Sequence, residues 1–528
     1  MKNMKRLSII ALALAALVSF GCSKDYLTTF PTSATAPATI FADTDAAALA
    51  VNGLNKLMNR QYTSYGQGYN GEGTVRLYAG EYPGHHLYAG ALTGFANTML
   101  GELYLSNTAS VSGYSWYYYY MLISNANTII ENIDNASGTE ADRGFIKAQA
   151  LCYRAYAYSN LAQLFGKRWK DDQGASKSCV LRLSSLDDVE LPLSTTAEVF
   201  AQVYADLDEA ISLFNASGKA NQRKDNYTMD LDVAYAIYAR VAMARLDYSK
   251  ALECANKVIN TNKYPLMSNS DYKAGFCNPT SEWIWYLYGA EDETLYFYSY
   301  FAYIAYNSSA GNCRNYPKCI SKELFNKIPA TDIRKGLWLD PTGYEGEYNT
   351  NTGKANAQKS SNKLYKYAFD YAKQDGRVGL YSTSSVFAYM QLKIRNNAQA
   401  GVGNLCLFRT SEMYLIAAEA NCMLNNEAAA RENLVTLNKN SGRNPEYSCN
   451  LSGAALLQEI KDYRGIELWG EGFTWFDLKR WGDSVVRHSY EDGGNFMASV
   501  AVTYGPNEKN NWVWVTPKIE TDYNKQIF

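Results

Sequence analysis

The sequence predicts a mainly α-helical protein in which tetratricopeptide-like helical hairpins pack against an irregular, loop-rich region with a few short strands. Apolar residues recur at three- and four-residue spacing along several segments. Two stretches, 234–265 and 409–445, each follow the order helix, turn, helix and proline. Between them the helical period fades, and Tyr, Gly, Asn and Ser become frequent.

Composition excludes several classes of protein. The chain has 528 residues, of which 47% are hydrophobic and 19% charged, so it is neither disordered nor a disulfide-stapled miniprotein. Its 50 basic residues balance 52 acidic ones, and we expect no nucleic-acid partner. Tyrosine is abundant, at 44 residues against 19 Phe. Its flat apolar ring and its hydroxyl suit contacts with partly polar ligands, and they also suit helix contacts that are partly exposed to water.

The N-terminus predicts export and a lipid anchor. Three basic residues precede an apolar run from Leu7 to Phe20, which is too short to span a bilayer and is typical of a signal peptide over 1–21. Cys22 follows a glycine, where a bacterial lipoprotein would be cleaved and acylated. Ordinary cleavage is the alternative, because Ser19 and Phe20 depart from the usual lipobox. Residues 22–42 form a Thr-, Pro- and Ala-rich tether.

The other nine cysteines have irregular spacing and encode no disulfide framework. A local pair between Cys313 and Cys319 is one possibility. We favour the alternative that most cysteines are small buried hydrophobic residues, as expected on the apolar helical faces of Cys152, Cys254, Cys406 and Cys422.

The first half, 43–265, is predicted to be helical with one long interruption. A first helix begins at Asp43 or Thr44 and runs through Arg60. Residues 61–110 lack a helical period and predict a long surface loop of the kind that often binds ligands. Further helices are expected at 116–133, 145–165, 198–214, 234–246 and 248–259.

The second half, 266–528, is predicted to begin with irregular loops at 266–404, including short strands at 282–287 and 294–297. Helical pairs then occupy 405–482, as helices at 409–423, 427–437, 454–468 and 473–481. Small alanines on facing helices let two backbones approach, as expected for Ala417, Ala418 and Ala420.

Two aromatic groups are candidate ligand sites. The first lies in the 61–110 loop, and its members are Tyr78, Tyr82, His85 and Tyr88. The second follows an alternating, strand-like Tyr296, Tyr298 and Tyr300 and continues through Tyr303 and Tyr306, with Tyr344 and Tyr348 in a later Gly- and Asn-rich loop. Tyrosine faces stack on the C–H face of a sugar while imidazoles bind its hydroxyls. Taken singly, each residue of the first group is better explained as an ordinary surface-loop residue, so the prediction concerns the loop as a whole. Half of the second tyrosine face could equally belong to the core.

The aromatic run from Trp116 to Tyr120 starts a helix, so its rings point to more than one face. Most of them are expected to pack between helices, with one or two exposed. Exposed tyrosines on this flank would suit a protein interface equally well.

The most specific pattern lies near the C-terminus, where the chain reads Arg464-Gly-Ile-Glu467-Leu-Trp-Gly-Glu471-Gly-Phe-Thr-Trp-Phe-Asp477-Leu-Lys-Arg480-Trp481-Gly. It resembles the C-terminal signature of the SusD/RagB family, with Tyr463 and Thr474 as departures. Agreement in order along the chain extends from Cys22 and the Pro31 region through Arg154, Asp206, Arg334, Arg409 and Glu419 to Pro517 and Asn524.

The resemblance implies a lipid-anchored protein on the cell-surface side of the Bacteroidetes outer membrane, with a SusD-like fold of tetratricopeptide-like helices. Such proteins capture a glycan, or in some members a peptide, and deliver it to a SusC-like TonB-dependent transporter. The family is not known for enzymes. Glycan and transporter are therefore the partners that the resemblance implies, alongside the membrane reached through the lipid anchor.

Two interpretations fit the charged residues of this signature. These residues are Arg464, Glu467, Glu471, Asp477 and Arg480, and Trp481 follows them. Paired carboxylates could be catalytic, but on a helical hairpin an ion-pair and capping network is the plainer interpretation. Three histidines and no paired Cys-x-x-Cys predict no metal site, and the letters Gly66-x-Gly68-x-x-Gly71 follow a helix rather than a strand, so no cofactor is expected. A helical glycosidase or lyase and a protein-only tetratricopeptide scaffold stay as alternative functions.

Overall fold

The computed structural model of the chain describes residues 37–527, except 67, 91, 93–94, 186–188, 220–222, 224, 290–298 and 398–399. Cys22, the expected signal peptide, most of the tether, the expected strand at 294–297, and Tyr296 and Tyr298 lie outside the described residues. Within the described part, no helix has both the length and the apolar composition needed to cross a bilayer.

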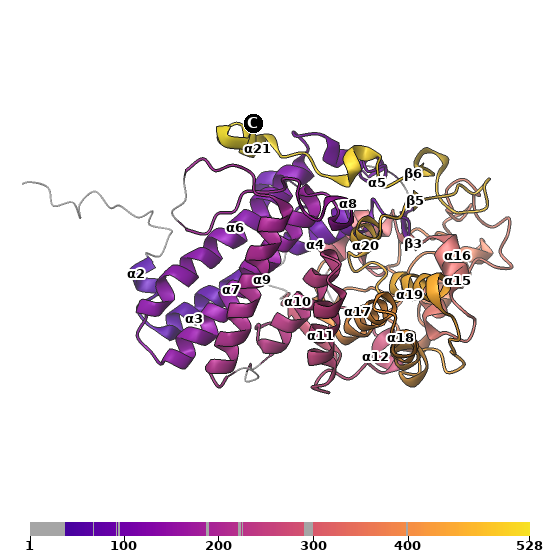
Figure 1. The fold of residues 1–528 in the computed structure, drawn as a ribbon. Coiled ribbons are helices and arrows are strands. Elements are labelled where there is room, and N and C mark those ends of the chain that lie inside the picture. The colour runs from indigo at the N-terminus through magenta and orange to yellow at the C-terminus, as the bar shows by residue number, and fades with distance from the viewer. Residues whose placement is uncertain are drawn as a thin grey trace, which may run out of the picture.

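Long helices of the first half lie side by side, as the indigo-to-magenta ribbons of Figure 1 show. Side-chain caps define where several of them begin. Asp43 accepts a hydrogen bond from the backbone of Ala46, and Thr195 and Glu198 form a reciprocal capping box. The helices are α3 (Thr44–Leu57), α6 (Ser110–Asn132), α7 (Glu140–Phe165), α9 (Thr196–Ala216), α10 (Leu231–Ala244) and α11 (Tyr248–Ile259).

The two predicted repeats pack directly on each other. The helices α10 and α11 form one hairpin, α17 (Thr410–Met423) and α18 (Glu427–Val435) form the next, and α11 lies against α17. Ala417, Ala418 and Ala420 are completely buried, because side chains this small allow the close approach of neighbouring helices. The last two helices, α19 (Gly453–Glu467) and α20 (Thr474–Trp481), follow one another, but α19 packs mainly on α17 and α20 mainly on residues 76–81 rather than on each other. The two predicted repeats are therefore confirmed, whereas the last two helices are not a closely packed pair.

Three two-stranded antiparallel sheets connect distant parts of the chain. They pair β1 (Leu87–Ala89) with β3 (Lys318–Ile320), β2 (Trp283–Leu287) with β4 (Leu405–Arg409), and β5 (Val485–Val486) with β6 (Thr503–Tyr504). The predicted strand at 282–287 is confirmed as β2, in which every residue is buried. Because β4 runs straight into α17, this sheet ties the irregular region to the second repeat.

Short elements fill the rest of the described chain, including nearly all of the helical structure between residues 266 and 404. The short α-helices are α2 (Pro37–Ile40), α4 (Gly71–Val75), α5 (Ala96–Met99), α8 (Trp169–Asp172), α12 (Asn269–Lys273), α13 (Tyr300–Ile304), α14 (Gly311–Arg314), α15 (Lys322–Lys327), α16 (Lys363–Tyr371) and α21 (Lys518–Thr521). Two π-helical turns are η3 (Arg76–Glu81) and η8 (Thr436–Asn440). The 3₁₀ turns are η2 (Thr63–Tyr65), η4 (Leu103–Leu105), η5 (Ile133–Asn135), η6 (Ile333–Leu337), η7 (Gln374–Gly376), η9 (Ala498–Val500), η10 (Lys509–Trp512) and η11 (Lys525–Ile527).

The segment 61–110 is not the surface loop that its composition predicts. It folds into short helices and strand β1, and side chains such as Leu77, Tyr82 and Leu87 lie in the core. Gly71 makes this possible, since it has a φ of +45° and a Cβ there would lie 1.8 Å from the carbonyl oxygen of Met58. The prediction failed because the segment buries aromatic rings through irregular backbone, which leaves no period to detect.

The described cysteines are all free thiols. The possible local disulfide between Cys313 and Cys319 is therefore not formed. Instead, Cys313 donates a hydrogen bond to the carbonyl oxygen of Ala302 at 3.1 Å, and Cys319 is completely buried. Burial raises the pKa of the Cys313 thiol to about 12, so it is protonated at neutral pH.

The C-terminal segment returns to the first half of the chain. Backbone N–H groups of Trp514, Val515 and Lys518 donate to carbonyl oxygens of Leu164, Tyr104 and Asn107 at 3.0, 3.1 and 2.8 Å. The yellow ribbon of Figure 1 runs along the edge of the helical region and ends at α21. The segment therefore joins the end of the described chain to α7 and to residues 104–107, just before α6.

Candidate functional site

The signature carboxylates form a buried ion-pair network. Arg409 and Arg334 donate to the two carboxylate oxygens of Glu467 at 2.6 and 2.7 Å, and all three side chains are almost completely inaccessible. Glu471 accepts from Arg409 at 2.8 Å and from Lys393 at 2.7 Å. Burial would raise the pKa of Glu471, but these two cations outweigh it and lower the pKa to about 2. A carboxylate held ionised in this way cannot donate a proton at neutral pH, as a glycosidase acid must.

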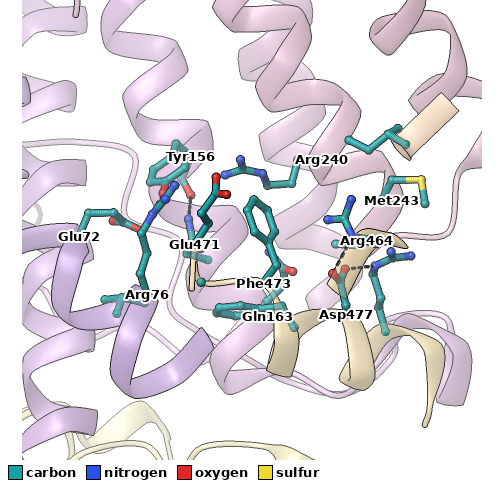
Figure 2. Close-up of a pocket in the computed structure, with 17 residues that line it drawn as sticks. Glu72, Arg76, Tyr156, Gln163, Arg240, Met243, Arg464, Glu471, Phe473 and Asp477 are labelled. Carbon is teal, nitrogen blue, oxygen red and sulfur yellow. Dashed lines mark hydrogen bonds and ion pairs between the residues drawn. The ribbon is translucent and has the colours of Figure 1, made fainter. Parts of the chain in front are cut away.

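A small cavity with a mixed polar and apolar lining lies between this network and the helices of the first half (Figure 2). Arg464 donates to Asp477 at 2.6 Å on one side, and Glu72 and Tyr156 lie on the other. Burial raises the pKa of Glu72, which accepts a hydrogen bond from the Tyr156 hydroxyl at 2.7 Å. The cavity has a volume of about 50 Å³. It is too small for a glycan, because ligand pockets commonly have about 300–1,000 Å³.

The two predicted aromatic groups meet in one cluster around Gly68. The rings of Tyr78 and Tyr82 lie 5.5 Å apart, and Phe95 lies 4.9 Å from Tyr82 and 6.4 Å from Tyr303. Gly68 has a φ of +87°, and a Cβ on it would lie 2.6 Å from the Tyr303 hydroxyl and 3.3 Å from that of Tyr78. Residues from the 61–110 segment and from α13 thus form a single structure.

Most of the predicted ligand tyrosines have no ring face open to solvent. The exposed fractions are 0% for Tyr82, 1% for Tyr88, 4% for Tyr300, 6% for Tyr303 and 5% for Tyr306. Tyr300 begins helix α13 rather than extending a strand, and its hydroxyl donates to the carbonyl oxygen of Gly470 at 2.6 Å. The expectation that these rings form an exposed stacking face is therefore wrong, because burying large rings stabilises the irregular region.

The other predicted residues are half-buried and lie apart. Tyr344 stacks on Tyr367 with ring centroids 4.9 Å apart and an interplanar angle of 15°, and Tyr348 lies 6.4 Å from the ring of Tyr490. The His85 ring lies 4.6 Å from that of His86, in the turn before β1. These residues do not join the cluster around Gly68.

Four tyrosines with partly accessible rings form what we call the tyrosine surface, namely Tyr65, Tyr69, Tyr78 and Tyr117. Tyr69 stacks on Tyr78 with centroids 6.2 Å apart, and Tyr65 lies 6.0 Å from Tyr69 and 5.6 Å from Tyr117. Tyr117 is 39% exposed on α6. Of the aromatic run 116–120, Tyr117 is exposed and Tyr120 half-buried, as expected for one or two rings. Tyr65 and Tyr69 were missed, although the glycines between them indicate a turn that presents side chains.

Tyr117 also lines a cleft of about 330 Å³. One wall is the apolar face of α6, with Trp116 and Tyr120, and the opposite wall is formed by residues 182–185 and α21. Polar groups line the same space: Asn127, Arg182, Ser184, Ser185 and Glu520. Glu520 accepts hydrogen bonds from Trp116 at 3.1 Å and from Arg182 at 3.4 Å, which closes the cleft at α21.

The arrangement has the chemistry of a polar-ligand site. Aromatic side chains offer flat apolar contact, and amide, hydroxyl, guanidinium and carboxylate groups offer hydrogen bonds of both polarities. Among the residues that the structure describes, no group of three or more His, Cys, Asp or Glu side chains is placed to hold a metal ion. The aromatic and polar groups of this surface are suited to contacts with a polar ligand.

Comparison with known proteins gives agreement along most of the chain. Residues 254–527, just over half of the sequence, match the SusD family, and residues 91–243 match a family described as starch-binding associating with outer membrane. A SusD-like protein of Formosa agariphila is 23% identical over 515 residues, covering 92% of this chain and 93% of its own.

Solved structures share the fold. A SusD-like carbohydrate binding protein from Bacteroides vulgatus is 25% identical, with a TM-score of 0.74 over 92% of this chain and 98% of its own. A SusD superfamily protein from Bacteroides thetaiotaomicron is 22% identical, with a TM-score of 0.72 over 92% and 99% of the two chains. The helical pairs, the buried signature network and these matches together establish that the chain belongs to the SusD family, a glycan-binding family associated with the outer membrane.

Proposed function

We propose that this protein captures an oligosaccharide at the cell surface and delivers it to a SusC-like TonB-dependent transporter. The observation that carries the proposal is the position of Tyr117, which belongs to the tyrosine surface and also lines the cleft. A glycan chain stacked along the tyrosine surface would enter the cleft at this ring. The polar groups of Arg182, Ser184 and Ser185 would then bind its hydroxyls.

The comparisons support this choice of ligand. The match to the family described as starch-binding spans 91–243, which includes both Tyr117 and Arg182. The Bacteroides vulgatus relative carries the description of a carbohydrate binding protein. Because glycan hydroxyls form hydrogen bonds of both polarities, the mixed lining of the cleft suits them.

The rim of the cleft supports a protein partner. Leu183, Val189, Ile519 and Tyr523 are exposed by 42, 53, 46 and 79%. Backbone and side-chain contacts hold the segments that carry them together, since Arg182 donates to the carbonyl oxygen of Val189 at 2.9 Å and pairs with Glu520. Exposed apolar residues grouped in this way are typical of a docking surface, and we propose that the transporter covers them. A lipid on Cys22 would keep the protein at the membrane.

The proposal treats the protein as a binding protein, not an enzyme. Affinity electrophoresis of a soluble form beginning after Cys22, in gels containing plant, host or microbial polysaccharides, tests it directly. Retardation by one polysaccharide, with no new reducing ends released from it, is the expected result. New reducing ends at enzymatic rates would contradict the proposal in favour of a glycosidase or lyase. Retardation by none, together with capture of peptides, would instead indicate peptide uptake.

A further inference from the structure

A second pocket, of about 210 Å³, lies where the 85–86 turn meets α19 and α20. We call it the histidine pocket; its lining includes His85, His86, Gln458, Lys461, Asp483 and Ser484. It shares no lining residue with the cleft beside Tyr117. Arg464 and Asp477 line both the histidine pocket and the small inner cavity, and Figure 2 shows this ion pair from the inner side.

The charged groups of the histidine pocket are paired with one another. Lys327 pairs with Asp462 at 2.6 Å, Lys461 with Asp483 at 2.7 Å, and Arg464 with Asp477 at 2.6 Å. Three cations thus face three anions. A ligand ion of either sign would compete with a partner that is already in place, whereas a neutral ligand would leave all three pairs undisturbed.

Two uncharged imidazoles complete the polar lining. The Nδ1 atom of His86 is buried and accepts or donates no hydrogen bond within the described residues, while Nδ1 of His85 accepts from the backbone of Val486 at 3.3 Å. Burial, with the charges of Arg487 and Lys327, lowers the pKa of His85 to about 3. Each neutral imidazole carries one donor and one acceptor nitrogen, which matches a hydroxyl group.

The helix α19 approaches the imidazole because it has a glycine at this point. A Cβ on Gly465 would lie 2.5 Å from Cε1 of His86. The nearby ring of Trp481 already packs on cations, with Lys461 and Arg480 each 4.7 Å from its centroid. Recognition in this pocket therefore depends on hydrogen bonds to hydroxyl groups rather than on stacking, which distinguishes it from the tyrosine surface.

We propose that the histidine pocket binds one neutral sugar unit through its hydroxyl groups. Its volume suits a single ring, its paired charges disfavour ions, and the unpartnered Nδ1 of His86 gains a hydrogen bond when a hydroxyl arrives. The site is separate from the cleft, so it does not depend on the proposed route of glycan capture.

The three histidines of the chain provide a direct readout. Protein with isotope-labelled histidine is titrated with glucose, galactose and N-acetylglucosamine to concentrations well above about 1 mM, a dissociation constant typical of weak ligands. We expect at least one sugar to shift the imidazole signals of His85 and His86 saturably. His488 is the internal control, because it lies outside the pocket and pairs with Glu323 at 3.1 Å.

Matched variants separate binding from general effects. His86→Phe retains a ring beside Gly465 but loses the hydrogen bond, and should weaken the sugar-induced shift of His85 about fivefold or more, whereas His488→Phe should not change it. Gln458→Ala provides a second test if His86→Phe does not fold. Tyr117→Ala should leave these shifts unchanged even where it abolishes polysaccharide retention, so the two proposals fail independently. No shift with any sugar, unchanged binding in both pocket variants, or shifts caused only by glycine or phosphate would overturn the proposal.

Discussion

The guanidinium group of Arg480 forms a two-point ion pair with the carboxylate of Glu419, and its Nη2–Oε2 distance is 2.6 Å. The pair joins α20 to α17, with both side chains buried. Trp481 adds a third hydrogen bond, from its indole nitrogen to Glu419 at 2.8 Å. Helix α20 of the signature is thereby fixed to α17 of the second repeat.

Loss of this pair should destabilise the fold strongly. Glu419→Gln leaves Arg480 buried without its full counter-charge, and we expect the free energy of unfolding to fall by about 3–5 kcal/mol. Asp370→Asn is the control, since its pair with Lys366 is exposed and its loss should leave stability nearly unchanged. Equilibrium unfolding in guanidinium chloride measures both. Equal losses in the two variants would contradict the assignment of Glu419 as a structural anchor.

Two buried tyrosines should respond differently to loss of their hydroxyls. The Tyr300 hydroxyl donates to Gly470, whereas the Tyr82 hydroxyl is buried with no hydrogen-bond partner in the described structure. Tyr300→Phe should therefore cost about 1 kcal/mol, and Tyr82→Phe should be neutral or slightly stabilising. Thermal unfolding of the two variants compares them directly. A larger loss in Tyr82→Phe would show that its hydroxyl has a role that the fold alone does not explain.

The carboxyl group of Glu81 should make stability depend on pH. Burial raises its pKa to about 7, although the backbone of Gly472 and the Thr474 side chain donate to it. A raised pKa favours the protonated form in the folded state, so its contribution is complete below about pH 4.5 and is lost as pH rises through 7. The stability difference between wild type and Glu81→Gln should therefore shift by about 2–3 kcal/mol, toward the variant, from pH 5 to pH 8.

The same measurement on Glu253→Gln, at an exposed pair with Lys250, controls for general effects of removing a carboxylate. Its stability should follow that of the wild type with pH. If Glu81→Gln keeps the same dependence of unfolding free energy on pH as the wild type, groups other than Glu81 produce that dependence.

Tyr117 should matter for glycan retention more than an equally exposed tyrosine elsewhere. Tyr117→Ala removes the ring shared by the tyrosine surface and the cleft, and should cost about 1–3 kcal/mol of binding to any retained polysaccharide. Tyr381→Ala is the matched control, because Tyr381 is 40% exposed but lines neither structure. Affinity electrophoresis measures both variants. Equal retention by Tyr117→Ala and wild type would remove Tyr117 from the site.

Helical pairs could be predicted from sequence because their signals are local. The stretch 248–259 coincides with α11, since Asp247 caps it and its apolar residues keep a regular period. The partners of the signature residues could not be predicted in the same way. Arg409 and Arg334 reach Glu467 from 58 and 133 positions away in the chain, a distance over which no spacing rule applies.

The candidate site was predicted only in outline. The abundance of tyrosine predicted ligand-binding aromatic groups at 61–110 and near residue 303, but composition does not distinguish a ring that packs in the core from one that faces solvent. Tyr82 and Tyr303 pack inward around Gly68, while Tyr65 and Tyr69 retain accessible faces. The cleft itself depends on α21, which approaches α6 from the far end of the chain.

That closure makes the cleft depend on two distant parts of the chain. Trp116 on α6 donates its indole hydrogen bond to Glu520, which lies 404 positions later in the sequence. The wall that α21 supplies is therefore present only when the C-terminal segment is docked on the first half of the chain. A chain truncated before α21 would keep α6 as one wall of the cleft and lack part of the opposite wall.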